Sequence, residues 1–237
     1  GKVTGVIANM VLLAVDGPVA QNEICYISTG GDRLMAEVIK INGAKVYVQV
    51  FESTRRLKIG EEAEFTGHML EVSLAPGMLS KNYDGLQNDL DKMEGVFLKR
   101  GLYTPALEDD KKWAFTPLAK VGDRVVAGDW LGNVKENWLD HKIMVPFKFE
   151  GEYTVASVAK EGQYTINDVV ATLKDKEGEI HNVTMVQKWP VKLAVKAYKS
   201  KPRPFRLLET GVRVIDTMNP ILEGGTGFIP GPFGTGK

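Results

Sequence analysis

The segment Gly-Pro-Phe-Gly-Thr-Gly-Lys at residues 231–237 constrains the fold more than any other part of the sequence. The pattern Gly-x-x-x-x-Gly-Lys is typical of a phosphate-binding loop, which connects a buried strand to a helix. Glycines are needed because successive backbone N–H groups must turn inward and approach phosphate oxygens that a side chain would keep away. We therefore predict a phosphate-binding loop, in which Lys237 reaches the phosphates as a point charge.

The surroundings of the loop bear on this prediction. Residues 227–230 form a short apolar run, which is a candidate for the buried strand that leads into the loop. The pattern expects a Ser or Thr after the lysine, whose hydroxyl would bind Mg²⁺, and then a helix, so both would lie beyond Lys237. A flexible, glycine-rich tail is the alternative that spacing alone leaves open.

Length and composition bound the class of protein. The 237 residues suffice for one large domain or several small ones with buried cores. The 30 basic and 30 acidic residues cancel, which argues against nucleic acid or an anionic membrane as a partner. The single cysteine, Cys25, excludes an internal disulfide and suits a reducing cytosol, and its apolar neighbours predict a small buried side chain. The most apolar stretch, residues 6–15, is too short to span a bilayer, so a cytosolic chain is expected.

Residues 1–75 carry the pattern of short β-strands. Val46, Val48 and Val50 alternate with other residues and therefore lie on one face of a strand. Asn42-Gly43, just before them, predicts a tight hairpin because such a turn needs a positive φ. Several short strands separated by Gly, Asp and Asn turns predict a small closed or sandwiched β-unit.

A connector is expected over residues 76–112. Pro76-Gly77 breaks the strand pattern, and the residues that follow show weak periodicity. A helical turn or two around residues 86–93 is the regular structure that we expect there.

Residues 113–186 carry a second β pattern. The segment at 120–132 is similar to the Gly-Asp-x-Val-x-x-Gly-Asp hairpin of biotinyl and lipoyl carrier domains, and a fainter repeat follows at 160–170. Two such hairpins predict a flattened β-sandwich. A swinging-arm carrier is the functional alternative, but the stretch near Trp138 lacks the lysine that those domains modify, and Lys142 lies next to the following strand.

Residues 187–210 are rich in proline and basic residues, which predicts an extended linker. A nucleic-acid-binding patch is the alternative for the basic run, but one short run in a neutral chain does not favour it. A short helical turn closed by Pro220 should follow. The histidines His68, His141 and His181 stand apart in the sequence, so no metal site is predicted.

Taken together, these segments resemble the N-terminal part of the catalytic A subunits of V-type (or archaeal A-type) rotary ATPases, of the bacterial kind. The resemblance covers the whole chain, and the Gly-Pro-Phe-Gly opening of the loop is its most specific part. Its other motifs are Leu-Ala-Pro-Gly-Met-Leu-Ser at 74–80, Tyr-Asp-Gly-Leu-Gln at 83–87, His-Lys-Ile-Met-Val-Pro at 141–146, Met-Val-Gln-Lys-Trp-Pro at 185–190 and Thr-Gly-Val-Arg-Val-Ile-Asp at 210–216.

The resemblance implies a chain that is mainly β. A six-stranded N-terminal β-barrel would occupy residues 1–75, followed by the connector at 76–112. An inserted β-rich bulge domain that resembles a barrel-sandwich hybrid would occupy residues 113–186, and this insertion distinguishes A subunits from their non-catalytic partners and from F-type β subunits. Residues 187–237 would begin an α/β P-loop nucleotide-binding domain.

The resemblance also implies a function for the full-length subunit, which would be an ion-transporting two-sector ATPase. Such subunits would alternate with non-catalytic B subunits in a hexamer that also binds a central stalk and a peripheral stalk. ATP hydrolysis or synthesis at their interfaces would be coupled to H⁺ or Na⁺ translocation. The expected location is cytoplasmic and peripheral to the cytoplasmic membrane, with membrane association only through partners and no nucleic acid.

Site residues are implied only in the loop. The expected cofactor is ATP or ADP with Mg²⁺, the expected catalytic residue is Lys237, and the Mg²⁺ ligand would lie beyond the end of the chain. The residues implied to bind the cofactor are Gly231, Pro232, Phe233, Gly234, Thr235, Gly236 and Lys237. Phosphoryl transfer depends on positioning and charge stabilisation, and the family's other catalytic groups are missing, so this chain alone is expected to be inactive.

Two alternatives of a different class remain open. The chain could be a non-catalytic assembly module, whose barrel and bulge make only subunit contacts and whose bulge docks a peripheral stalk. It could also be an RNA-translocating ATPase of the Rho type, which the zero net charge disfavours.

Overall fold

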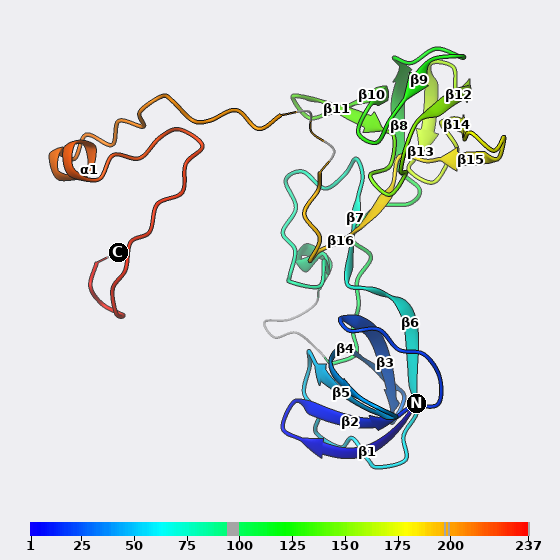
Figure 1. The fold of residues 1–237 in the computed structure, drawn as a ribbon, viewed down its shortest axis with the longest axis vertical. Helices are drawn as coiled ribbons and strands as arrows, with labels where there is room; N and C mark the ends of the chain where they lie inside the picture. Colours follow the sequence, from blue (N-terminus) through cyan, green and yellow to red (C-terminus); the bar gives the residue numbers. More distant parts are fainter. Residues whose placement is uncertain (94–99, 197, 199, 237) are drawn as a thin grey trace. The chain divides into compact units, whose positions relative to one another are not determined.

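The computed structural model describes residues 1–93, 100–196, 198 and 200–236. The chain divides into two compact units, residues 1–197 and residues 198–237. Most of the regular structure consists of β-strands (Figure 1), so the predicted mainly β fold is confirmed.

The first unit begins with a six-stranded antiparallel sheet in the order β1-β2-β5-β4-β3-β6. Its strands are β1 (Lys2–Ile7), β2 (Met10–Ala14), β3 (Glu23–Thr29), β4 (Asp32–Asn42), β5 (Lys45–Val50) and β6 (Ala63–Met69). The sheet closes just before β6, where the Val3 N–H donates to the Glu61 carbonyl at 2.9 Å and the Gly60 N–H donates to the Val3 carbonyl at 2.8 Å. An isolated bridge between Lys2 and Glu62 adds to this closure, and the predicted six-stranded barrel is confirmed.

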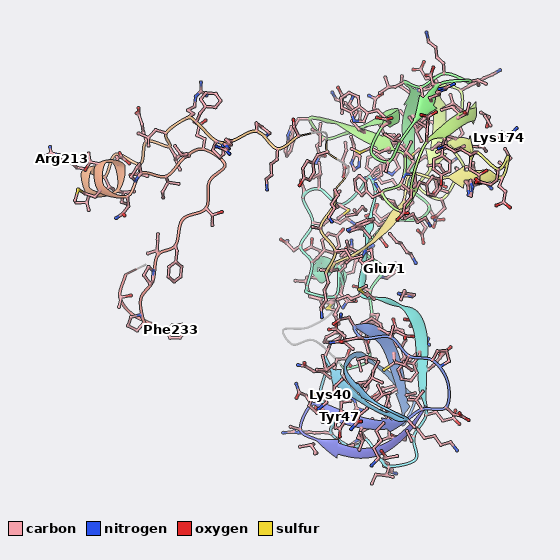
Figure 2. The ribbon with its side chains drawn as sticks, viewed as in Figure 1. Lys40, Tyr47, Glu71, Lys174, Arg213 and Phe233 are labelled. Atoms are coloured by element: carbon pink, nitrogen blue, oxygen red, sulfur yellow. The ribbon has the colours of Figure 1, made fainter. Side chains whose placement is uncertain are left out.

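The barrel core follows from the alternation of residues in its strands. Val46, Val48 and Val50 of β5 are buried, as predicted, and the residues between them are partly exposed. Lys40 and Tyr47, which are opposite each other in the β4–β5 pairing, are labelled in Figure 2. One buried set of apolar side chains therefore fills the barrel.

The predicted hairpin is also confirmed, with one difference. Asn42 pairs with Lys45 at the ends of β4 and β5, so the loop itself is Gly43-Ala44. Gly43 has a φ of 59°, in the left-handed region that favours glycine, and neither Asn42 nor Ala44 has a positive φ. Cys25 lies in the barrel core, and burial raises the pKa of its thiol to about 12, which agrees with the predicted small buried side chain.

The connector contains a 3-10 helix, Leu90–Lys92, within the range where a helical turn was predicted. Before it, β7 (Glu71–Leu74) pairs antiparallel with β16 (Gln187–Pro190) in a two-stranded sheet. The prediction of an extended linker is therefore wrong for residues 187–190. A proline argues against a central strand, but Pro190 ends an edge strand, where its missing N–H costs no essential ladder hydrogen bond.

A second β region follows the connector and contains two four-stranded sheets, in the orders β11-β10-β8-β13 and β15-β14-β12-β9. The strands are β8 (Lys112–Pro117), β9 (Arg124–Val125), β10 (Trp130–Glu136), β11 (Leu139–Met144), β12 (Tyr153–Val158), β13 (Gly162–Thr165), β14 (Ala171–Lys174) and β15 (Ile180–Val183). Phe115 lies at the centre of one buried apolar cluster and Leu173 belongs to another. The predicted β-rich bulge is therefore present, with cores of its own.

The sequence repeat in this region has a structural counterpart in its turns. The Lys120 N–H donates to the Asp123 carboxylate at 2.8 Å, and the Thr165 N–H donates to the Asp168 carboxylate at 2.7 Å. Aspartate stabilises tight turns by accepting such hydrogen bonds. Lys142 lies within β11 with its ammonium 5.1 Å from the centre of the Trp130 ring, and not at a hairpin tip.

The second unit has little regular structure. Its helix α1 (Arg213–Met218) ends before Pro220, as predicted. Leu207 and Leu222 form an isolated antiparallel bridge. None of the described residues of this unit is buried.

The strand predicted at residues 227–230 is not formed. Phe228 is 87% exposed and Ile229 is 70% exposed. A strand needs a neighbouring strand to bond its backbone N–H and C=O groups, and the described residues of the second unit contain no strand. This prediction is therefore wrong for the chain as it stands.

Among the described residues, no helix has the length and apolar character that a membrane crossing requires.

Candidate functional site

The predicted phosphate-binding loop is described from residue 231 to residue 236, and these residues are all exposed. Phe233, labelled in Figure 2, is among the most exposed side chains of the chain. The Thr235 hydroxyl donates to the Pro232 carbonyl at 2.8 Å and so closes a turn within the loop. Lys237, the predicted catalytic residue, lies outside the described residues.

Two glycines of the loop adopt conformations that suit an anion cradle. Gly234 has a φ of 80° and Gly236 a φ of 77°, both in the left-handed region where other residues are strained. No atom lies within 4 Å of a Cβ built on either glycine, so the space beside the backbone is open. Left-handed residues turn successive N–H groups toward one concave side, which is how backbone loops bind phosphate. The described part of the loop therefore fits a phosphate group.

The same residues offer little to a magnesium ion. Mg²⁺ prefers oxygen ligands in octahedral geometry. Within residues 231–236 the one side-chain oxygen belongs to Thr235, whose hydroxyl already donates to Pro232. A Mg²⁺ ligand from the protein would have to come from elsewhere.

Asp216 of α1 binds the residues that precede this helix. Its carboxylate accepts hydrogen bonds from the Thr210 hydroxyl at 2.6 Å, from the Thr210 N–H at 3.0 Å and from the Gly211 N–H at 3.0 Å. The bond from the Thr210 hydroxyl is the main reason why the pKa of Asp216 is lowered. The motif at 210–216 therefore forms its own local structure and brings no reactive group to the loop.

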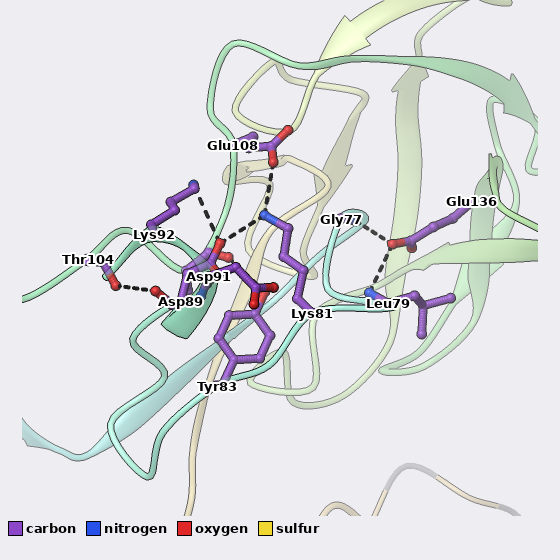
Figure 3. A network of polar contacts seen from close by, with 11 residues as sticks. Gly77, Leu79, Lys81, Tyr83, Asp89, Asp91, Lys92, Thr104, Glu108 and Glu136 are labelled. Carbon is purple, nitrogen blue, oxygen red and sulfur yellow. Dashed lines mark hydrogen bonds and ion pairs between the residues drawn. The ribbon is translucent and has the colours of Figure 1, made fainter. Parts of the chain in front are cut away.

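The most buried charges of the described residues lie in the first unit, in a network that the sequence did not reveal (Figure 3). Asp89 is 1% exposed, and its carboxylate lies 3.1 Å from the Lys81 ammonium and 3.6 Å from the Lys92 ammonium. The Lys81 ammonium also lies 2.9 Å from Glu108. Burial opposes ionisation of Asp89, but the hydrogen bond and charge of Lys81 outweigh it and lower its pKa. The hydrogen bond to Glu108 raises the pKa of Lys81.

Glu136 forms the second half of this network. It is 3% exposed and accepts hydrogen bonds from the Gly77 N–H at 2.7 Å and from the Leu79 N–H at 3.2 Å. Its other oxygen lies 2.7 Å from Nδ1 of His141. Figure 3 shows Gly77 and Leu79 turned toward this carboxylate.

This network explains why the motifs at 74–80 and 141–146 belong together. They hold the connector against the second β region through groups that are 57 to 59 residues apart in sequence. Such distant pairs leave no local signal, which is why the sequence did not predict them. The two buried carboxylates, Asp89 and Glu136, both have charged or hydrogen-bonding partners among the described residues, so we assign the network a structural role.

Comparisons with known proteins agree on both β regions. Residues 3–67 match the model of the ATP synthase alpha/beta family, beta-barrel domain, and residues 104–192 match the ATPsynthase alpha/beta subunit barrel-sandwich domain.

Curated relatives align with the chain over its whole length. It is 48% identical to the V-type ATP synthase alpha chains of Borrelia recurrentis (strain A1) and Borrelia duttonii (strain Ly) over 240 aligned positions. It is 45% identical to the V-type ATP synthase alpha chain 1 of Treponema pallidum (strain Nichols). The chain spans 42% of the two Borrelia proteins and 41% of the Treponema protein.

Proposed function

Because the chain belongs to the ATP synthase alpha/beta family, we propose that it is part of the catalytic subunit of a V- or A-type rotary ATPase. The complete subunit would bind ATP and hydrolyse or synthesise it, in a cycle coupled to H⁺ or Na⁺ translocation. The observation that carries this proposal is the 48% identity, over 100% of the chain, to relatives named V-type ATP synthase alpha chain. That alignment includes the loop at 231–237.

The loop is the proposed nucleotide site. The backbone from Gly231 to Gly236 would bind the phosphates of ATP or ADP, and the left-handed Gly234 and Gly236 support this role. Lys237 would neutralise charge on the transferred phosphoryl group. Mg²⁺, when bound, would supply further charge neutralisation, with its protein ligand outside residues 231–237.

The domain organisation is proposed to follow the sequence boundaries. Residues 1–75 would form the barrel that lines one end of the hexamer, and residues 76–112 the connector. Residues 113–186 would form the bulge domain, and residues 187–237 the start of the nucleotide-binding domain. The barrel core and one apolar cluster that lies wholly within residues 113–186 support this division, whereas a second cluster also includes Ala75 and Leu107.

The proposed partners are non-catalytic B subunits in an alternating hexamer, a central stalk and a peripheral stalk. The proposed location is the cytoplasmic face of the membrane, with contact to the membrane only through these partners. The relatives' names and the zero net charge support an ATPase complex over an RNA-translocating motor. They also favour the catalytic subunit over a module that serves assembly alone.

Substitution of Lys237 in the full-length subunit, assembled with its partner subunits, tests the proposal. Lys237→Ala should lower the rate of ATP hydrolysis by at least about 100-fold, because the charge on the phosphates is no longer stabilised. Assembly should be unchanged by size-exclusion chromatography. Lys58→Ala, at an exposed lysine of the barrel, is the matched control and should keep full activity. A Lys237→Ala complex as active as the control would overturn the proposal.

A further inference from the structure

Three side chains with metal-binding groups meet at the turn between β14 and β15. One ligand atom from each of Asp175, Glu179 and His181 lies within 4.8 Å of the other two. Lys174 and Ile180 are the last paired residues of the two strands, so Asp175 and Glu179 extend the same hairpin. Figure 2 labels Lys174, which marks the place of this turn.

Strand geometry explains why the side chains of Glu179 and His181 point to the same face of the hairpin. Residues two apart along an extended segment point to the same face, and the Asp175 N–H donates to the Glu179 carbonyl at 3.1 Å across the turn. Gly178, with a φ of 95°, permits the tight turn that returns the chain to Asp175. A spacing of Asp-x-x-x-Glu-x-His across a glycine turn therefore brings three ligands together.

Two of the three ligands, Asp175 and His181, are ordered by contacts within the protein. The His181 ring packs against Phe149 and Tyr153, with centroids 5.5 and 5.6 Å away, and its Nε2 lies 2.7 Å from Asp175 Oδ2. Asp175 Oδ1 accepts the Glu179 N–H at 2.8 Å, which fixes the plane of the carboxylate. Side chains already ordered lose little entropy when they bind an ion.

The charges of the cluster also favour a cation. In the part of the chain that the structure describes, neither Asp175 nor Glu179 forms an ion pair with a lysine or an arginine. Two neighbouring carboxylates without such a partner repel each other. An imidazole nitrogen beside them suits first-row transition ions and Zn²⁺ better than Mg²⁺ or Ca²⁺, which prefer oxygen ligands throughout.

We propose that Asp175, Glu179 and His181 form a binding site for a divalent transition-metal ion, with Zn²⁺ as the best match and water completing its coordination. Three protein ligands and a water are a common coordination set for zinc. The ion would replace the hydrogen bond between His181 and Asp175 and would cross-link the β14–β15 hairpin. The prediction of no metal site rested on the isolation of the histidines, and it overlooked the carboxylates near His181. The site is independent of the loop and of the proposed ATPase activity.

Calorimetric titration of the chain with ZnCl₂ at neutral pH tests the site. One saturable site should appear, and His181→Ala should weaken it by more than about tenfold. His68→Ala, which removes an exposed histidine of the barrel, is the matched control and should leave the affinity unchanged. Absence of saturable binding, or equal affinities in the two variants, would overturn the proposal.

A second variant and a second metal distinguish loss of the metal site from loss of the fold. Glu179 is exposed, so Glu179→Gln should fold normally and should still weaken Zn²⁺ binding by more than about tenfold. Co²⁺ bound at the site should give visible d–d absorption that Zn²⁺ abolishes and excess Mg²⁺ does not. Unchanged Zn²⁺ affinity in folded Glu179→Gln would contradict the assigned ligand set.

Discussion

The two units of this chain differ in how far their apolar side chains are buried. Phe115 in the first unit is fully buried, whereas Phe205 and Phe228 in the second unit are 92% and 87% exposed. The first unit pairs its strands into sheets, and three clusters of buried apolar side chains pack within it, although Ile7 and Trp138 remain exposed. The described residues of the second unit form one six-residue helix and one isolated bridge, and none of them is buried. Apolar sequence becomes buried structure only where other elements are present to pack on it.

This contrast agrees with the proposed function. The chain spans 42% of its Borrelia relatives, and a nucleotide-binding domain needs a parallel sheet covered on both faces.

The largest effect is expected in hydrogen exchange. Amides of β4 and β5 should exchange about 10³–10⁴ times more slowly than unstructured amides, because they open only when the first unit unfolds. Amides of residues 222–236 should exchange at nearly the unstructured rate. Mass spectrometry after deuterium labelling measures both, and equal protection in the two regions would remove the contrast.

The next largest effect is expected from a matched pair of phenylalanine substitutions, one in each unit. Phe115→Ala should lower the free energy of unfolding by about 3–5 kcal/mol, because it opens a cavity in a closed core. Phe228→Ala should change it by less than about 0.5 kcal/mol, because the ring is already in water. Urea unfolding followed by circular dichroism measures both. A similar cost at the two positions would show that Phe228 is packed in solution.

Loss of the buried carboxylate at Asp89 should have a smaller effect. Asp89→Asn should destabilise the first unit by about 1–3 kcal/mol, because Lys81 and Lys92 each lose a charged partner next to a buried amide. Asp91→Asn, at an exposed neighbour in the same 3-10 helix, should cost less than about 0.5 kcal/mol. Urea midpoints compare the two, and equal values would mean that the network in Figure 3 adds no stability.

The smallest effect is expected in the pH dependence of the stability that this network contributes. The pKa of Asp89 is lowered from its ordinary value of 3.8, so its stabilising contribution is present above that value and is lost as the pH falls below it. The pKa of Lys81 is raised from 10.5, so its contribution is present below that pH and is lost above it. The difference in urea midpoint between the wild type and Asp89→Asn should therefore shrink in acid. A difference that stays constant down to about pH 2 would contradict this sign.

The sequence predicted the parts of this fold that are encoded locally. Alternating valines in β5 and the Asn42-Gly43 pair located the hairpin. The barrel itself was predicted, but the contact between Val3 and Gly60 that closes it and the pairing of β7 with β16 were not, because both join segments far apart in sequence. Long-range pairing depends on tertiary packing, which no local window contains.

The candidate sites also differ in whether they are local in sequence or are formed by distant contacts. The predicted phosphate-binding loop is one continuous motif, so its residues could be named from spacing, and its role as a nucleotide site stays a prediction. The strand before it was predicted from apolar character alone, and its absence shows that this signal needs neighbouring strands. Glu136 and the cluster around His181 depend on contacts across turns and sheets, which the sequence pattern did not reveal.

Titration of the 237-residue chain with ATP, with and without Mg²⁺, tests the claim that ATP binding needs parts of the complete subunit that residues 1–237 do not supply. Isothermal calorimetry should detect no binding tighter than about 1 mM, which corresponds to about −4 kcal/mol, and Mg²⁺ should not improve it. The full-length subunit in its complex should bind far more tightly under the same conditions. Tight, Mg²⁺-dependent binding of ATP by the 237-residue chain would contradict the account.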